Sequence, residues 1–172
     1  MADLDTALAA CRAAVDELAV NAGRSAATWT TPRAEGKWSP SQLIEHVARA
    51  FDESANVVSG APSKFPTLPK FLRPIMRKFF FDRILQNGAF PKARTNRPLN
   101  PERGEPTPVE GAARLGAAHH RFERACRQRA GSADHIDSAI FGKVDLVDYV
   151  RFQELHARHH RRQMPENQAL VQ

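Results

Sequence analysis

Residues 145–164 read DLVDYVRFQELHARHHRRQM, and the pattern of this stretch decides the fold. It predicts a helix that begins at Asp145, a good N-cap residue, with the carboxylate of Asp148 in the first turn. Pro165 is expected to end the helix, because proline disfavours helical geometry in the residue before it. At about 100° per residue, one side of this helix carries a mainly apolar set: Leu146, Tyr149, Val150, Gln153, His156, Ala157, His160 and Met164.

Two histidines of that side, His156 and His160, are four residues apart and therefore lie one helical turn from each other. Two imidazoles at this spacing can hold one divalent metal ion, as they do in helical zinc sites. The alternative is that the pair is an accident of composition or a polar pair within the core. His159 is expected to point the opposite way, among arginines.

A second helix has a clear start, in which Ser39 is the N-cap, Pro40 takes the first helical position and Gln42 completes a capping box. His46 falls on the apolar face of this helix and is directed inward. Facing helices build metal sites from such residues, and three buried imidazoles without a common partner would carry a desolvation cost. His46, His156 and His160 are therefore the candidate ligands of one ion.

Composition limits the classes to which the protein can belong. A chain of 172 residues, 42% of them hydrophobic, predicts a single domain over residues 1–172. The sequence contains no run of eighteen apolar residues, so no membrane span is predicted. Its acidic start lacks the apolar core of a signal peptide, so we expect a cytoplasmic protein. Cys11 and Cys126 fit buried reduced thiols, although a disulfide or a catalytic thiol stays an alternative.

The rest of the chain also reads as helix and connector. A first helix is predicted from Asp3 to Asn21, and a further one from Thr107, with a capping box, to about Ala130. His119 lies at the edge of the inner face of this helix, either as a half-buried surface histidine or near the substrate. Residues 132–144 are expected to be a connector, and no strand is predicted.

The middle of the chain, residues 60–106, is rich in proline and basic residues and contributes much of the net charge of +6. A short helix is predicted from Pro74 to Asn87, with Gly88 as its stop. The segment has three interpretations: a solvated surface, a lid that attracts an anionic substrate, or a contact surface for a second subunit, a membrane or nucleic acid. It lacks the alternating basic and aromatic pattern of a single-strand binder, so nucleic acid is not the expected partner.

Three segments carry a resemblance to a known family. Residues 38–47 (WSPSQLIEHV), Phe141-Gly142 before a helix cap, and residues 156–163 (HARHHRRQ) resemble the DinB-like family, also called YfiT-like metal-dependent enzymes. The resemblance implies a four-helix bundle of up-down-down-up order, often dimeric. It also implies one divalent metal ion on three histidines, which correspond here to His46, His156 and His160. Tyr149 departs from the tryptophan usual in that family.

The resemblance implies chemistry more loosely than it implies fold. Members with assigned activity include S-transferases that use low-molecular-weight thiols such as mycothiol or bacillithiol, and a related maleylpyruvate isomerase. We therefore expect a metal-dependent transferase with zinc, nickel or iron and a small-molecule substrate. Tyr149, Gln153 and His119 are candidates to contact the ligands or the substrate, and arginines of the middle segment are candidates to hold carboxylates.

Two other functions stay open at this point. A hydrolase at the same metal site would need a general base, and Glu45 and Glu154 both lie off the ligand face. A binding module without catalysis would use the basic segment for an acidic partner, with the histidines structural. No Gly-rich phosphate loop, paired-cysteine zinc pattern or Gly-x-Ser-x-Gly turn points to another chemistry.

Overall fold

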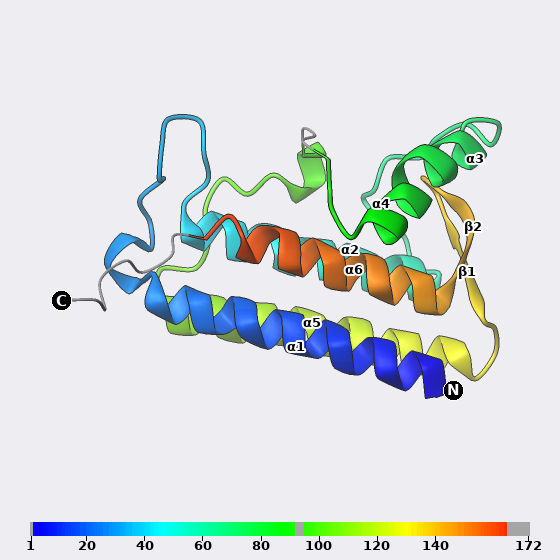
Figure 1. Ribbon diagram of the computed structural model, residues 1–172, viewed down its shortest axis with the longest axis horizontal. Helices are drawn as coiled ribbons and strands as arrows, with labels where there is room; N and C mark the ends of the chain where they lie inside the picture. Colours follow the sequence, from blue (N-terminus) through cyan, green and yellow to red (C-terminus); the bar gives the residue numbers. More distant parts are fainter. Residues whose placement is uncertain (1, 92–94, 165–172) are drawn as a thin grey trace.

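The computed structural model describes residues 2–91 and 95–164, and this part of the chain is mostly helical. Its long helices are α1 (Ala2–Arg24), α2 (Pro40–Ser59), α5 (Pro108–Ala130) and α6 (Leu146–Arg161). These helices lie roughly along one axis, with α1 and α6 running one way and α2 and α5 the other (Figure 1). α2 packs along α5, and α1 packs along both α6 and α5. The helices share one apolar core, in which Cys11 and Cys126 are buried as free thiols.

The start of α2 confirms the predicted capping box. The Ser39 hydroxyl accepts from the backbone N–H of Gln42 at 3.3 Å, and the Gln42 side-chain oxygen accepts from the backbone N–H of Ser39 at 3.0 Å. Pro40 occupies the first helical position, and Gly60 ends the helix with a φ of 75°. This cap fixes where α2 begins and therefore which of its side chains face inward.

The other predicted helix ends are reproduced with three differences. α1 (Ala2–Arg24) continues three residues beyond its predicted end at Asn21. α5 begins after Thr107, whose hydroxyl accepts from the Glu110 N–H, but its capping box is incomplete because the Glu110 carboxylate accepts from the Thr107 hydroxyl instead of the backbone. α6 begins after Asp145 as predicted and ends at Arg161, three residues earlier than Met164. Pro165, the predicted stop, lies outside the described residues.

A two-stranded hairpin joins α5 to α6, so the prediction of a connector without strands is wrong and the chain is not purely helical. β1 (His135–Ser138) pairs antiparallel with β2 (Gly142–Asp145). Ile136 lies opposite Val144, and both are buried against the helices. Strands of four residues are too short for a period-2 pattern to stand out in the sequence.

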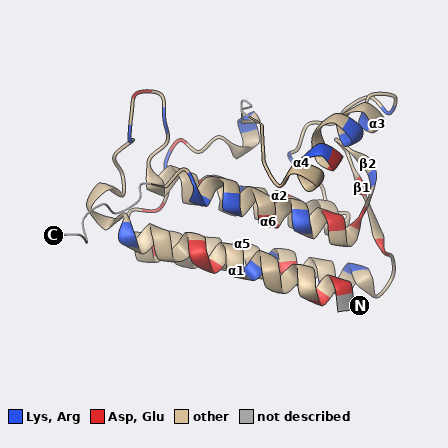
Figure 2. Ribbon diagram, in the orientation of Figure 1, with Lys and Arg blue, Asp and Glu red and all other residues tan. Residues whose placement is uncertain are grey.

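The predicted short helix of the middle segment exists, with an irregularity that the sequence did not predict. It consists of α3 (Arg73–Met76), a π-helical stretch η2 (Arg77–Phe81) and α4 (Asp82–Asn87), and Gly88 ends it with a φ of 63°. Several Lys and Arg residues lie along this α3–α4 segment (Figure 2). A short 3₁₀ turn, η1 (Ala26–Thr28), precedes α2 in the sequence, and another, η3 (Arg97–Leu99), follows α4. No helix in the described ranges is long and apolar enough to span a membrane.

The middle segment is fastened to α2 at both of its ends. Near its start, the buried carboxylate of Glu53 accepts from the Ser63 hydroxyl at 3.0 Å and the Lys64 N–H at 2.7 Å. Near its end, the Ser41 hydroxyl donates to the Glu105 carbonyl at 2.9 Å, to which the indole N–H of Trp29 also donates. The described parts of the segment lie over α2 and α6 (Figure 1).

Candidate metal centre

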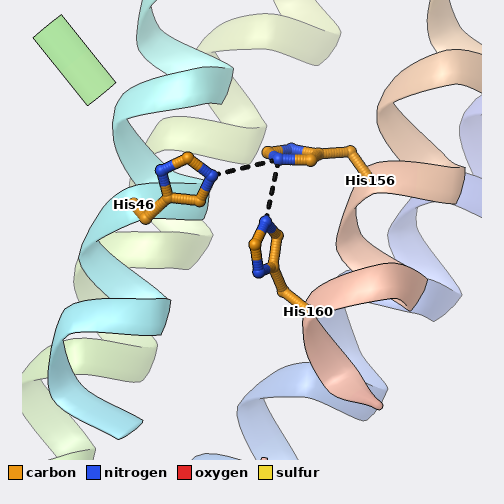
Figure 3. A group of neighbouring side chains, drawn as sticks. All are labelled: His46, His156 and His160. Carbon is orange, nitrogen blue, oxygen red and sulfur yellow. Dashed lines mark hydrogen bonds between the residues drawn. The ribbon is translucent and has the colours of Figure 1, made fainter. Parts of the chain in front are cut away.

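Three histidines from two helices converge at one point, as the sequence predicts. His46 comes from α2, and His156 and His160 come from successive turns of α6 (Figure 3). Nε2 of His156 lies 3.1 Å from Nε2 of His46 and 3.0 Å from Nε2 of His160. His159 bonds to Gln163 and does not join the group, but it lines the same cavity, so the prediction that it points the opposite way is wrong.

Hydrogen bonds at the opposite ring nitrogens fix the protons of two of these imidazoles. Nδ1 of His46 lies 2.8 Å from the Leu99 carbonyl oxygen, and a carbonyl only accepts, so His46 carries its proton on Nδ1. Nδ1 of His160 lies 3.0 Å from the side-chain oxygen of Gln163, to which it donates in the same way. Nε2 of each ring therefore presents a lone pair to the centre of the group.

The three nitrogens cannot satisfy one another. If His156 carries its proton on Nε2, a single N–H faces two lone pairs, those of His46 and His160; otherwise three lone pairs face each other. A divalent cation at the junction accepts all three lone pairs at once, and the three ligand atoms lie within 4.8 Å of one another. The residues present therefore fit a divalent transition metal ion, held by one nitrogen from each histidine.

The protonation state of the group also suits a metal ion. Burial lowers the pKa of His46 from its ordinary value near 6.5 to about 4. Burial, followed by the neighbouring imidazoles, lowers the pKa values of His156 and His160 well below their ordinary value. At neutral pH the three rings are neutral, which is the form that coordinates a metal.

A cavity of about 790 Å³ lies beside the three histidines. The middle segment supplies one apolar wall: Phe65, Leu68, Met76, Phe80, Phe90 and Leu99. The hairpin and α6 supply another: Ile140, Phe141, Tyr149 and Phe152. A mainly apolar cavity of this size, with a few polar groups at one place, is typical of a small-molecule site.

The charged residues of the cavity are not those that the sequence suggested. Arg33 and Lys37, in the loop between α1 and α2, line it, whereas the described arginines of the middle segment do not. Arg73 and Arg77, for example, bond the carbonyls of Leu68 and Lys143 on the outside. No Asp or Glu is found among the described residues that line the cavity.

The three further candidates separate into two groups. Tyr149 and Gln153 line the cavity; the Tyr149 hydroxyl lies 3.2 Å from the Ser54 hydroxyl, and the side-chain oxygen of Gln153 is buried without a partner. His119 does not line the cavity and is 2% exposed instead of half-buried. Its ring packs edge-on against Phe51, which excludes it from contact with the cavity contents.

His119 belongs to a second group of metal-capable side chains, with His120 and Glu123. This group is a weaker candidate because the Glu123 carboxylate already accepts two bonds from Arg127, at 2.9 and 3.2 Å. His120 is exposed, so the group has no enclosed centre. Within the described chain, the histidines of α2 and α6 form the better site.

Sequence reasoning missed two side chains that shape the centre. The Trp38 ring packs 4.7 Å from the His46 ring and 6.4 Å from that of His160, between centroids, and covers the group from the α2 side. Gln163, in the turn just after α6, orients His160, and its spacing of three residues from that histidine was a usable signal. The role of the Leu99 carbonyl could not be predicted from the sequence, because every residue has a backbone carbonyl.

The two carboxylates weighed as bases and the two cysteines are occupied or buried elsewhere. Glu45 bonds Arg49 at 2.7 Å, and Glu154 bonds Arg158 at 2.8 Å, so both carboxylates are held in ion pairs. Burial raises the pKa of Cys126 to about 12 and raises that of Cys11 further. Neither cysteine lines the cavity, so neither is placed to act as a nucleophile there.

Comparison with known proteins agrees with this geometry. A family model described as the DinB superfamily matches residues 4–164, which includes all three histidines of the centre. Neither a curated protein nor a solved structure matches the chain significantly.

Proposed function

Because this chain belongs to the DinB superfamily, we propose that it is a metal-dependent enzyme that joins a small thiol to an electrophile. The observation that carries the proposal is the convergence of three neutral Nε2 atoms at the wall of a cavity large enough for a substrate. Zinc, nickel and iron all suit three imidazole ligands. An ion held there supplies positive charge that favours the thiolate, the nucleophilic form of a thiol.

The thiol in this proposal comes from outside the chain. Cys11 and Cys126 are buried, protonated at neutral pH and absent from the cavity wall. A low-molecular-weight thiol would therefore enter beside His46, His156 and His160. The second substrate would occupy the apolar part of the cavity, where the aromatic walls exclude water from the reacting atoms.

A hydrolase at the same site is the second candidate, and the surroundings of the histidines count against it. Hydrolysis calls for a general base within hydrogen-bond reach of the attacking water. The described lining residues include no carboxylate, and Glu45 and Glu154 are committed to arginines. Nε2 of His159, which also lines the cavity, is already bonded to the Gln163 side chain at 2.8 Å. The Tyr149 hydroxyl is no substitute, since burial raises its pKa above the ordinary value and keeps it protonated.

Two finer features belong to this proposal as well. We assign the long helices to a four-helix bundle of up-down-down-up order, on the basis of their directions in Figure 1 and the packing of α1 on α6 and α2 on α5. We also retain a homodimer, which is common in the family. Sedimentation equilibrium tests the second point, with a mass near 19.1 kDa or twice that value as the two outcomes.

The activity is tested with protein reloaded separately with zinc, nickel and iron. Each form is offered 1-chloro-2,4-dinitrobenzene together with cysteine, glutathione, bacillithiol or mycothiol. In the expected reaction a C–S bond forms, the C–Cl bond breaks and the thiol proton passes to solvent with chloride. A rate above the uncatalysed one that His156→Ala abolishes supports the transferase. Cleavage of 4-nitrophenyl acetate that is independent of thiol and lost in His156→Ala would support the hydrolase instead.

A further inference from the structure

The cavity beside the histidines has an uneven distribution of charge. Arg33 and Lys37 are both exposed side chains that line it, and no described carboxylate lies within ion-pair distance of either. Some other exposed arginines are paired, as Arg127 is with Asp5 and Glu123, but others are not, so what distinguishes Arg33 and Lys37 is their place in the cavity wall. The cavity therefore has two positive side chains and no negative one among its described residues.

The loop that carries these two cations leads directly into the residue that packs on the histidines, so we place the cations at the histidine end of the cavity. Lys37 is the neighbour of Trp38, whose ring packs 4.7 Å from the His46 ring between centroids. Three neutral imidazoles leave the double charge of any bound divalent ion uncompensated, because none of the ligands is a carboxylate. Positive potential of this kind, enclosed by low-dielectric walls, concentrates anions.

The opposite end of the cavity is aromatic. The Phe90 ring lies 5.3 Å from the His156 ring and 5.0 Å from that of Phe152, between centroids, and so bridges the histidines and the apolar end. Phe152 in turn packs on Phe141 at 5.7 Å, and Phe141 stacks on Phe80 at 6.2 Å. A flat apolar body that follows this row gains contact with aromatic faces along its length.

We infer that the site selects an amphipathic organic anion, with its anionic group beside Arg33, Lys37 and the histidines and its apolar or aromatic body along Phe90 and Phe152. The inference names the substrate class of the proposed enzyme and rests on that function for its biological role. Its physical content is independent of the metal, because the cationic and aromatic groups belong to the chain itself.

A matched pair of fluorescent probes tests it on the metal-free full chain. 8-Anilinonaphthalene-1-sulfonate and N-phenyl-1-naphthylamine share one aromatic body, and only the first has a negative charge. We expect the sulfonate to bind about tenfold more tightly than the neutral amine, a difference of about 1.4 kcal/mol, which two exposed ion pairs together can supply. Added salt is expected to weaken only the sulfonate.

Charge reversal then locates the contact. Arg33→Glu with Lys37→Glu should raise the Kd of the sulfonate about tenfold or more and leave that of the neutral amine within about twofold. The matched control is Arg124→Glu with Lys70→Glu, which makes the same change of net charge at exposed residues outside the cavity. Phe71→Asn with Phe79→Asn removes two phenylalanines that are 75% and 64% exposed and could bind the probe at the surface.

Each outcome decides the matter. Loss of sulfonate binding in the Arg33 and Lys37 variant alone supports the inference. Equal affinity for both probes, binding of neither, an equal effect of the control reversal, or loss in the Phe71 and Phe79 variant would each overturn it. If the protein binds no metal but shows the expected probe pattern, the proposed enzyme is contradicted and the anion site is still supported. Failure of the proposed function can therefore be told apart from failure of this inference.

Discussion

At the scale of single residues, the metal centre depends on the hydrogen bonds that Nδ1 of His46 and Nδ1 of His160 make on the side away from the centre. A backbone carbonyl orients His46 and a side-chain amide orients His160, and in both rings this places the lone pair on Nε2. Partners of this kind fix the tautomer and ring direction of metal-binding histidines. Their loss is expected to weaken a metal site without removing any of its ligands.

Gln163 offers a direct test of this orienting role. Gln163→Leu removes the acceptor for Nδ1 of His160 and should lower zinc affinity roughly 10- to 100-fold. Gln163→Glu keeps an oxygen acceptor in the same place and should bind zinc at least as tightly as the parent. Competition with a chromophoric chelator measures both. Equal affinity of the parent and the leucine variant would show that Gln163 does not orient a ligand.

The two cysteines carry a prediction about pH. A thiol whose pKa is raised from about 9 to about 12, as that of Cys126 is, stays protonated at pH 8. Native metal-free protein should therefore react with 5,5′-dithiobis(2-nitrobenzoate) at least about 100-fold more slowly than protein unfolded in urea. A fast-reacting thiol in the native protein would contradict this and restore a cysteine as a candidate nucleophile.

The same shift has a consequence for stability. Between pH 9 and about 12 the unfolded chain loses the Cys126 proton while the folded chain keeps it, so the unfolded state binds fewer protons. The free energy of unfolding should then fall as pH rises through this window, by up to about 1.4 kcal/mol per pH unit for one group. Urea titrations of the parent and of Cys126→Ala, which should lose this part of the slope, measure the effect.

The candidate ligands could be predicted from sequence because helical periodicity fixes the direction of a side chain once the helix start is known. The Ser39 cap sets the phase of α2 and so the inward direction of His46. The same reasoning misjudged His119, whose neighbour Phe51 comes from another helix and completes its burial. The Leu99 carbonyl reaches His46 across 53 residues of chain, and no local pattern reports such a contact.

At the scale of elements, α5 approaches the loop before α2 at a glycine. A Cβ added at Gly111 would lie 2.6 and 2.8 Å from two carbons of the buried Trp29 ring, whereas one added at Gly116 of the same helix meets nothing within 4 Å. The Trp29 indole also donates to the Glu105 carbonyl at 2.8 Å, so the ring has little freedom to move. Gly111 is therefore required by packing, and Gly116 is not.

The pair predicts opposite effects of one substitution. Gly111→Ala should destabilise the protein by about 1–3 kcal/mol through overpacking. Gly116→Ala should stabilise it by about 0.5–1 kcal/mol, because alanine is the better helix former. Urea unfolding followed by circular dichroism measures both. Stabilisation by Gly111→Ala would mean that Trp29 does not lie against α5 as described.

The errors of sequence interpretation occur where elements are short. The helix starts were predicted because Ser39, Thr107 and Asp145 carry local capping signals. The hairpin was missed because four residues per strand give too little period-2 pattern. The basic character of residues 60–106 was evident, but which side of the segment faces the cavity depends on its attachment to α2 through Glu53 and Ser41.

At the scale of the whole molecule, the arrangement brings together three distant parts of the chain. α2 and α6 supply the histidines, the loop between α1 and α2 supplies the cations, and the middle segment supplies aromatic cover. Lys and Arg residues occur along the α3–α4 segment (Figure 2), and none of them lines the cavity, so the positive charge of this segment is separate from the cavity.

The measurement that tests the central claim most directly is the metal content of untagged protein, determined by plasma mass spectrometry. The comparison is with a His46→Ala, His156→Ala, His160→Ala variant and with His120→Gln, a control at an exposed histidine outside the centre. The account predicts about one transition metal ion per chain in the parent and the control, and none in the triple variant. No metal in the parent after reloading with zinc, nickel and iron, or equal metal in the triple variant, would contradict it.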